Sequence, residues 1–346
     1  MYESFFGLRE RPFDLNPNPR FLLMTPSHRE ALANLQYGLT ARKGLTVLIG
    51  EAGSGKTTLI HAVLKEWEQA GHRVAHLSNP TLTRGEFFEY LAEVFDMSEE
   101  ARASKARFLS EFIQMVTARH ARGELTGLVI DEAQSLSDEL LEEVRLLVNA
   151  ETSSEKLFQV LLVGQPELGV RLSHPALRQI KQRIALRCTL STLDVRQVAS
   201  YISGRIHIAG GVAGHVFTRE AVMAVHAHSG GIPRVISVIC DNALIAGFAA
   251  GVRPVTSTMV EDVCREFGID RTPTPLEGAF EPVAVHAGGP RAVEHGPQRP
   301  AVEAHGPVAD DRLVRDDRQE TGREGQGGAG LFQHFVVAGK RRFSFF

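Results

Sequence analysis

One segment, GEAGSGKT at positions 50–57, constrains the fold of this chain more than any other stretch of its sequence. It matches the pattern GxxxxGK[ST] in full, follows the apolar run LTVLIG, and precedes a helical pattern that begins at Lys56. Glycines allow backbone N–H groups to turn inward around phosphate oxygens, and the N-terminus of the next helix attracts the same charge. The segment therefore predicts a phosphate loop between a buried strand and a helix, which is an α/β arrangement.

Two side chains of this loop supply groups that a nucleotide site needs. Lys56 carries a positive charge for the β- and γ-phosphates, and the Thr57 hydroxyl can ligate Mg²⁺. We therefore expect ATP and Mg²⁺ as ligands. The residues expected to contact the nucleotide are Gly50, Glu51, Ala52, Gly53, Ser54, Gly55, Lys56, Thr57 and Thr58.

A second apolar strand, in GLVIDEAQ at positions 127–134, ends in two carboxylates. In a parallel sheet this strand delivers Asp131 and Glu132 to the carboxyl edge, where such folds bind ligands. We expect Asp131 to hold Mg²⁺ through its water shell and Glu132 to polarise the attacking water as a general base. Carboxylates at both positions favour hydrolysis of ATP over binding alone.

Apolar runs bounded by turn residues recur through residues 1–270, with amphipathic helical patterns between them. This alternation predicts an α/β fold whose parallel sheet is covered by helices on both faces. After residue 193 the strand signal ends and a small all-α domain is expected. The predicted strands are 45–50, 73–78, 128–131, 158–164 and 184–190. The predicted helices are 57–70, 84–95, 105–121, 136–150, 194–209, 218–229, 232–249 and 256–267.

The composition changes near residue 271, after which 76 residues contain 11 glycines and 7 prolines. Such a segment cannot bury enough apolar surface to offset its chain entropy, so a disordered tail is expected. Its last residues, KRRFSFF, combine a basic run with aromatic residues. They could dock on a partner or an anionic surface, or could be an incidental terminus with no role. The predicted domains are an N-terminal arm (1–43), an ATPase domain (44–192), a helical lid (193–270) and the tail (271–346).

Charge and cysteine content exclude several other classes of protein. With 38 basic and 41 acidic side chains the formal charge is −3, so the chain is no bulk polycation that binds nucleic acid by charge alone. Its three cysteines form no CxxC pair, which disfavours a zinc ribbon or a disulfide framework. The first residues do not resemble a signal peptide, and no run of about 18 apolar residues is present. We expect a cytoplasmic protein that reaches a membrane only peripherally or through a partner.

Two polar residues that follow predicted strands have both a functional and a structural interpretation. Gln165 could hydrogen-bond the γ-phosphate or the attacking water, or serve only as a polar turn residue before Pro166. Asn79 could restrain Glu132, or cap a turn before Pro80.

Three arginines have similar alternatives. Arg178 and Arg183 lie ahead of the fifth predicted strand, where an arginine could reach the γ-phosphate of a neighbouring subunit and stabilise transition-state charge. A single surface arginine is usually only a solvated charge, and that interpretation also stays open for both. Arg234, in SGGIPR, opens a helix of the second domain, where it could close onto the nucleotide or merely cap that helix.

Along the chain, the phosphate loop, the carboxylate pair, a polar residue after a strand, arginines before the last strand and GIPR follow one another. This order of motifs is similar to that of the AAA+ ATPases, a family of P-loop NTPases. The opening MYESFFGLRERPFDLNPNPRFLLMTPSHREALANLQYGL resembles the ExeA/GspA-like general secretion ATPases, as do GEAGSGKTTL, VIDEAQSL, LLVGQPEL, LRQIKQRIA and GGIPR. The similarity covers about residues 1–268, and the short members associated with exosortase (PEP-CTERM) and exopolysaccharide loci are the most similar. Longer members add a transmembrane helix and a periplasmic peptidoglycan-binding domain after the lid. Neither has a counterpart here, so we do not expect wall binding.

The resemblance implies roles for the residues left open above. It implies that Gln165 is sensor 1, that Arg183 is the arginine finger with Arg178 as second candidate, and that Arg234 is sensor 2.

The resemblance also concerns the segment before the phosphate loop, which packs on adenine in similar ATPases. Pro12, Phe13 and the helix from His28 are candidates for this contact. Alternatively, Phe5, Phe6 and Phe13 anchor the N-terminal arm to the core, and both interpretations can hold together.

The functional expectation is a homo-oligomeric ring, expected to be a hexamer, that uses ATP hydrolysis to power or regulate an envelope assembly. The assembly would be a secretion, exosortase-linked or polysaccharide-export system, contacted at the inner membrane through a partner. Two alternatives stay open. Transposition ATPases of the TnsC/TniB type, which act with DNA, share this core and the DEAQ-like strand end. The chain could also be a nucleotide-gated scaffold that turns over slowly.

Overall fold

The computed structural model describes residues 1–15, 19–21 and 23–269, which belong to the first of the chain's two units, Met1–Ala279. The predicted disordered tail and its KRRFSFF terminus lie outside the described residues.

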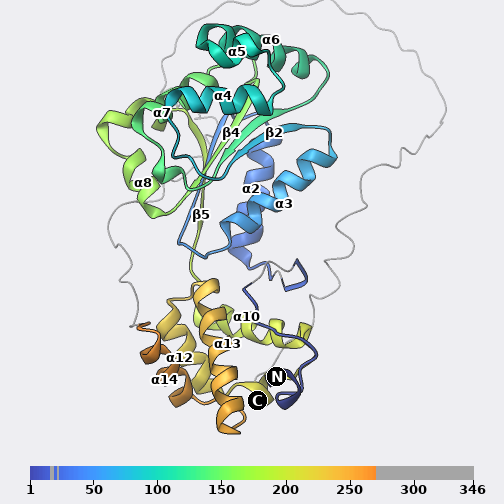
Figure 1. The fold of residues 1–346 in the computed structure, drawn as a ribbon, viewed down its shortest axis with the longest axis vertical. Helices are drawn as coiled ribbons and strands as arrows, with labels where there is room; N and C mark the ends of the chain where they lie inside the picture. The colour runs from blue at the N-terminus through green and yellow to red at the C-terminus, as the bar shows by residue number, and fades with distance from the viewer. Residues whose placement is uncertain (16–18, 22, 270–346) are drawn as a thin grey trace, which may run out of the picture. The chain divides into compact units, whose positions relative to one another are not determined.

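A five-stranded parallel sheet with the order β2-β3-β4-β1-β5 carries the phosphate-loop segment (Figure 1). Each residue of β1, β3 and β4 is buried, because the helices cover both faces of the sheet. The α/β parallel fold predicted from the sequence is therefore confirmed. The strands are β1 (Leu45–Gly50), β2 (Arg73–Leu77), β3 (Thr126–Ile130), β4 (Phe158–Gly164) and β5 (Ile184–Leu190).

Successive residues of the central strand β1 contribute to two different hydrophobic cores, as the pleat requires. Val47 and Ile49 lie in one core, and Leu48 lies in the other. The first core is covered by α4 (Arg84–Val94), α5 (Glu99–Ala103), α6 (Lys105–Ala121), α7 (Asp138–Val148), α8 (Pro166–Leu172) and α9 (Arg178–Lys181). The second is covered by α2 (Pro26–Thr40) and α3 (Lys56–Gln69) (Figure 1).

A third core lies among the helices after residue 193. Four of them match the predicted helices to within one residue at each end, and one short helix was not predicted. The N-terminal arm, with α1 (Tyr2–Phe5), contributes Tyr2, Phe6, Leu8 and Phe13 to the same core. The helices are α10 (Val195–Ile208), α11 (Ala213–Val216), α12 (Arg219–Ser229), α13 (Pro233–Ala250) and α14 (Ser257–Glu266).

One helix of the described residues, α13, is long and apolar enough to cross a membrane by length and composition alone. No run of about 18 apolar residues was predicted from the sequence, because Arg234 and Asp241 interrupt this one. Part of α13 is buried in the third core, and the Tyr2 hydroxyl donates to the Asp241 carboxylate. Core helices of folded domains have this same composition, so the feature is weak evidence for a membrane span.

Candidate nucleotide site

The loop between β1 and α3 adopts a conformation that only glycine fits at two positions. Gly53 and Gly55 have φ angles of +78° and +100°, in the region that L side chains rarely adopt. A Cβ atom at Gly53 would lie 2.6 Å from the Cβ of Arg234, and one at Gly55 would lie 2.8 Å from Nε2 of His28. Backbone geometry and close packing therefore both explain the glycines of the motif.

Lys56, the first residue of α3, is buried within this loop. Its Nζ donates hydrogen bonds to the carbonyl oxygens of Gly50 at 2.9 Å and Glu51 at 3.0 Å. Burial lowers the pKa of Lys56, while the nearby carboxylates of Glu132 and Asp131 act in the opposite direction. A buried ammonium group held by backbone carbonyls is well placed to exchange those partners for phosphate oxygens.

Thr57 and Asp131 bring together two hard oxygen donors. The Thr57 hydroxyl donates to Oδ2 of Asp131 at 3.2 Å, and Oδ1 of Asp131 accepts from the backbone N–H of Glu132 at 2.9 Å. Asp131 directly follows β3 and is 6% exposed. Hydroxyl and carboxylate oxygens are the ligands that Mg²⁺ prefers, so these two residues fit the expected metal ion.

Glu132 lies beside Asp131 in an unusual backbone conformation, with φ at +50°. Its Oε2 accepts hydrogen bonds from Nε2 of Gln134 at 2.5 Å and from Nε2 of Gln165 at 3.1 Å. The bond from Gln134 lowers the pKa of Glu132, and Gln165 and the positive charge of Lys56 add to this effect. The carboxylate is therefore ionised at neutral pH and can accept a hydrogen bond from water.

Gln134 connects two strand ends, a role that was not predicted from the sequence. Its amide donates to Glu132, and its Oε1 accepts from the backbone N–H of Gln165 at 3.1 Å. The only signal for it in the sequence is an amide two residues after the carboxylate pair. Gln134 therefore aligns the end of β3 with the end of β4.

The remaining predicted residues of the loop differ in their surroundings. Ser54 is buried, and its Oγ has no hydrogen-bond partner among the described residues. Glu51, Ala52 and Thr58 are exposed. An unpartnered hydroxyl in a loop with two left-handed glycines suits a segment that gains contacts when an anion binds.

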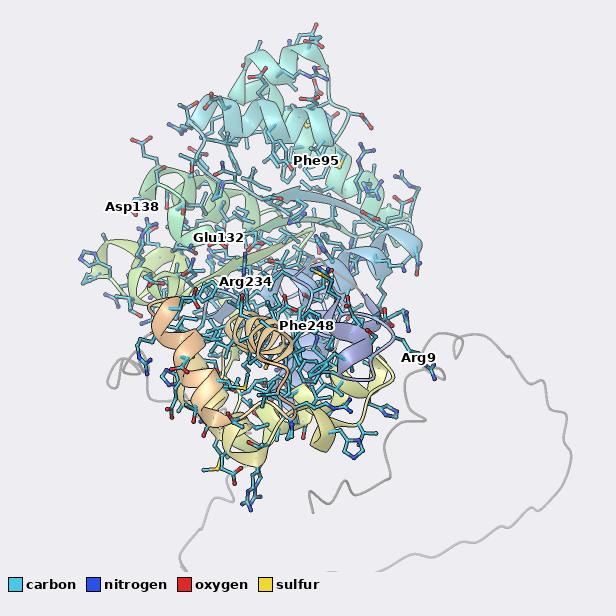
Figure 2. The ribbon with its side chains drawn as sticks, turned by 60° about the horizontal axis from the view of Figure 1, so that its bottom comes forward. Arg9, Phe95, Glu132, Asp138, Arg234 and Phe248 are labelled. Atoms are coloured by element: carbon cyan, nitrogen blue, oxygen red, sulfur yellow. The ribbon has the colours of Figure 1, made fainter. Side chains whose placement is uncertain are left out.

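Arg234 belongs to the helical region but contacts the loop. It is the second residue of α13, and its backbone N–H donates to the carbonyl of Gly53 at 3.3 Å. Its side chain is exposed. Figure 2 labels Arg234 together with Glu132.

Asn79, in contrast, is part of a local turn. Its Oδ1 accepts from the backbone N–H of Thr81 at 3.4 Å and from the Thr81 hydroxyl at 3.0 Å. Within the described residues it makes no hydrogen bond to Glu132, although β2 and β3 pair up to Leu77 and Ile130, two residues before each of them.

The first candidate finger arginine, Arg183, lies at the opposite edge of the sheet. Arg183 immediately precedes β5, which runs parallel to β1 with Ile184 beside Leu45 and Leu190 beside Gly50. Seven strand residues at about 3.3 Å each separate Arg183 from the edge that carries the loop by roughly 20 Å. Arg183 and Arg178 are exposed, and neither side chain makes a hydrogen bond or salt bridge to another described residue.

Pro12 and Phe13 lie in the helical region rather than at the loop. The Pro12 carbonyl accepts from Nε of Arg205 at 2.5 Å, and the fully buried Phe13 ring meets Phe217 edge-on at 6.1 Å between centroids. This packing is that of an anchor for the N-terminal arm. Of the segment before the loop, it is His28 whose side chain contacts the loop.

Comparisons with known proteins agree with this geometry. A family model described as an AAA domain matches residues 40–172. General secretion pathway protein A of Aeromonas hydrophila is 41% identical over 251 residues, which are 72% of this chain and 46% of that protein. This chain therefore spans less than half the length of that relative.

Solved structures support the fold. Cdc6p from Pyrobaculum aerophilum is similar with a TM-score of 0.55 and 17% identity, over 74% of this chain and 70% of that one. The Aeropyrum pernix ORC2 protein in its ADPNP-ADP complexes is similar with a TM-score of 0.51 and 20% identity, over 74% of this chain and 71% of that one. The chain belongs to the AAA+ proteins and, among them, to the ExeA/GspA-like group.

Proposed function

We propose that this chain binds ATP with Mg²⁺ at the carboxyl edge of its sheet and hydrolyses it. The observation that carries the proposal is the hydrogen-bonded meeting of three segments at this edge. Thr57 of the loop bonds to Asp131 after β3, and Gln165 after β4 bonds to Glu132. Membership of the AAA+ proteins supports the same activity.

The chain's own groups divide the work of the reaction. Lys56 and the loop N–H groups bind the β- and γ-phosphates, while Thr57 and Asp131 hold Mg²⁺, which when bound neutralises phosphate charge. Glu132 orients a water molecule toward the γ-phosphorus, with Gln165 fixing the carboxylate through its 3.1 Å hydrogen bond. As the water oxygen bonds to phosphorus, the bond to the ADP oxygen breaks and the water proton passes to Glu132.

The position of Arg183 supports an oligomer. A side chain roughly 20 Å from its own loop, measured along β5, cannot stabilise charge on the phosphate bound there. Its exposed guanidinium can reach the site of another subunit in a ring, with Arg178 as the second candidate. We infer that each complete catalytic centre combines the loop of one protomer with an arginine of the next.

The name of the Aeromonas relative supports a role in secretion, and we propose that this chain acts from the cytoplasm on an envelope assembly. More specifically, we propose that this envelope assembly is an exosortase-linked or polysaccharide-export system. Replacing the native gene with the Lys56→Ala variant tests it, because secreted protein and exported polysaccharide can both be measured. Unchanged export of both would contradict the proposal.

Nucleotide titration tests the site itself. Lys56→Ala should weaken ATP affinity at least about 100-fold, since it removes the buried cation of the loop. Lys65→Ala is the matched control, because Lys65 is an exposed lysine of the same helix α3. Equal affinities in the two variants would overturn the site assignment.

A further inference from the structure

A histidine outside the loop motif is buried directly against the phosphate loop. His28 lies in the first turn of α2, whose N-cap residue is Thr25, and its side chain is 6% exposed. Its Nε2 is 2.9 Å from the carbonyl oxygen of Ser54. The same ring occupies the space that a Cβ at Gly55 would need. The imidazole therefore touches the two residues that precede Lys56.

The partners of the ring determine which nitrogen carries its proton. The Ser54 carbonyl can only accept a hydrogen bond, so Nε2 must be the donor. The oxygen of the Thr25 hydroxyl lies 2.5 Å from Nδ1 and accepts a hydrogen bond from the backbone N–H of His28 at 3.3 Å. The proton of the Thr25 hydroxyl can therefore be donated to Nδ1. Burial lowers the pKa of His28. All contacts are satisfied by a neutral imidazole protonated at Nε2.

This contact bears on how the loop binds anions. A loop that turns its N–H groups toward a phosphate turns its carbonyl oxygens away from it, and each buried carbonyl then needs a donor elsewhere. For Ser54 that donor is the ring of His28. Without it, rotation of the Ser54–Gly55 peptide would let the carbonyl find water and would move the Gly55 N–H away from the phosphate.

We infer that His28 is a positioning residue for the nucleotide site, whose Nε2–H group holds the Ser54–Gly55 peptide in the orientation that binds phosphate. The inference rests on the proposed nucleotide binding and adds a residue that lies 22 positions before the loop motif begins. It requires that any group able to donate from the position of Nε2 can replace the ring.

The tautomer can be observed without changing the site. Long-range ¹H–¹⁵N correlation spectra of the labelled full chain distinguish the two neutral imidazole forms, and His28→Gln identifies the His28 signal among 14 histidines. We expect the Nε2-protonated neutral form at pH 7. A neutral ring protonated at Nδ1 could not donate to Ser54 and would overturn the inference.

Two substitutions separate the two ring nitrogens. Glutamine places its amide near the position of Nε2 and can still donate to Ser54, whereas asparagine reaches only the position of Nδ1 and Thr25. We expect His28→Asn to weaken ADP and ATP binding about tenfold, the usual worth of one such hydrogen bond. His28→Gln should stay within about threefold of the wild type. Equal effects of the two substitutions would overturn the inference.

Controls separate this inference from the proposed function and from loss of stability. His72→Asn changes a partly buried histidine that precedes β2, at the opposite edge of the sheet, and should leave nucleotide affinity unchanged. If the wild type binds ATP and Lys56→Ala does not, but His28→Asn binds like the wild type, the positioning role fails while the site stands. If the wild type binds no nucleotide, both fail. A lower melting temperature of His28→Asn with unchanged affinity would indicate a merely structural contact.

Discussion

The two edges of the parallel sheet differ in how they use polar side chains. At the carboxyl edge, groups from the loop, β3 and β4 bond to one another, as in the Thr57–Asp131 and Gln165–Glu132 pairs. At the amino edge, charges are paired with opposite charges close in the fold, as in the Arg73–Asp96, Arg119–Glu124 and Lys156–Glu151 salt bridges. The amino edge thus neutralises its own charges, whereas the carboxyl edge gathers donors and acceptors that a ligand can use.

Arg183 is an exception to this difference between the two edges. Its substitution is expected to have the largest effect on hydrolysis. Arg183 lies at the amino edge, but its proposed target is the carboxyl edge of a neighbouring protomer. Arg183→Ala should retain ATP affinity, because the loop is untouched, and lose about 10³-fold or more of the hydrolysis rate. Steady-state phosphate release measured against protein concentration checks this. Wild-type activity should also fall on dilution as protomers separate.

Mixing two inactive variants distinguishes action between protomers from action within one. Lys56→Ala retains Arg183, and Arg183→Ala retains the phosphate loop, so mixed rings should regain part of the activity. If the two proteins co-assemble and remain inactive, Arg183 acts within its own chain or has only a structural role.

At the carboxyl edge itself, Glu132→Gln should bind ATP and hydrolyse it at least about 100-fold more slowly, the usual scale for loss of a general base. The substitution keeps the size of the side chain and its place beside Gln134 and Gln165. Single-turnover measurements with bound ATP separate this effect from binding. Turnover near that of the wild type would mean that another group activates the water.

The meeting of residues at this edge was predictable from the sequence because parallel strands end at the same edge of a sheet. A full phosphate-loop motif after one apolar run, and the Asp131–Glu132 pair after another, suffice for that deduction. Most of the longer helices were also found, since each has an apolar face that repeats over several turns. The 15-residue helix α2 is the exception, because it entered only as the helix from His28 that the resemblance implies. Short helices such as α1, α5 and α11 were missed because four or five residues show no period.

The contacts made by Gln134 and His28 could not be predicted in the same way. Each depends on the direction of one side chain across the fold, and neither lies at a position that the loop motif defines. The N-terminal arm is a further case. Its aromatic residues join the third core through contacts with residues more than 200 positions later, as in Phe13–Phe217 and Tyr2–Asp241, for which the local pattern gives no signal.

Gln134 offers a smaller and more specific test of the carboxyl edge. Its hydrogen bond is the first cause of the lowered pKa of Glu132. Glu132 can accept a proton only while ionised, so activity is present above its pKa and is lost as pH falls through it. Gln134→Ala should raise that pKa and move the acid limb of the kcat profile to higher pH. Gln182→Ala, at an exposed position after α9, should leave the profile unchanged.

The smallest expected effect is that of Asp96→Asn at the amino edge. It is compared with the same substitution of Asp131 at the carboxyl edge. Asp96 has a φ of +53°, which asparagine also accommodates, and its exposed carboxylate pairs with Arg73. Arg73 keeps its hydrogen bonds to the Val94 carbonyl, so Asp96→Asn should change the free energy of unfolding by about 0.5 kcal/mol or less. Turnover should stay at the wild-type level.

The same change at Asp131 removes a charged oxygen from the proposed Mg²⁺ site, and hydrolysis should fall at least about 100-fold. Denaturant unfolding and phosphate release, measured on both variants, give the contrast directly. If Asp96→Asn slowed turnover as much as Asp131→Asn, the amino edge would take part in the chemistry of its own protomer. The division between a structural edge and a ligand-binding edge would then be wrong, and an action of Arg183 within its own chain would have to be considered again.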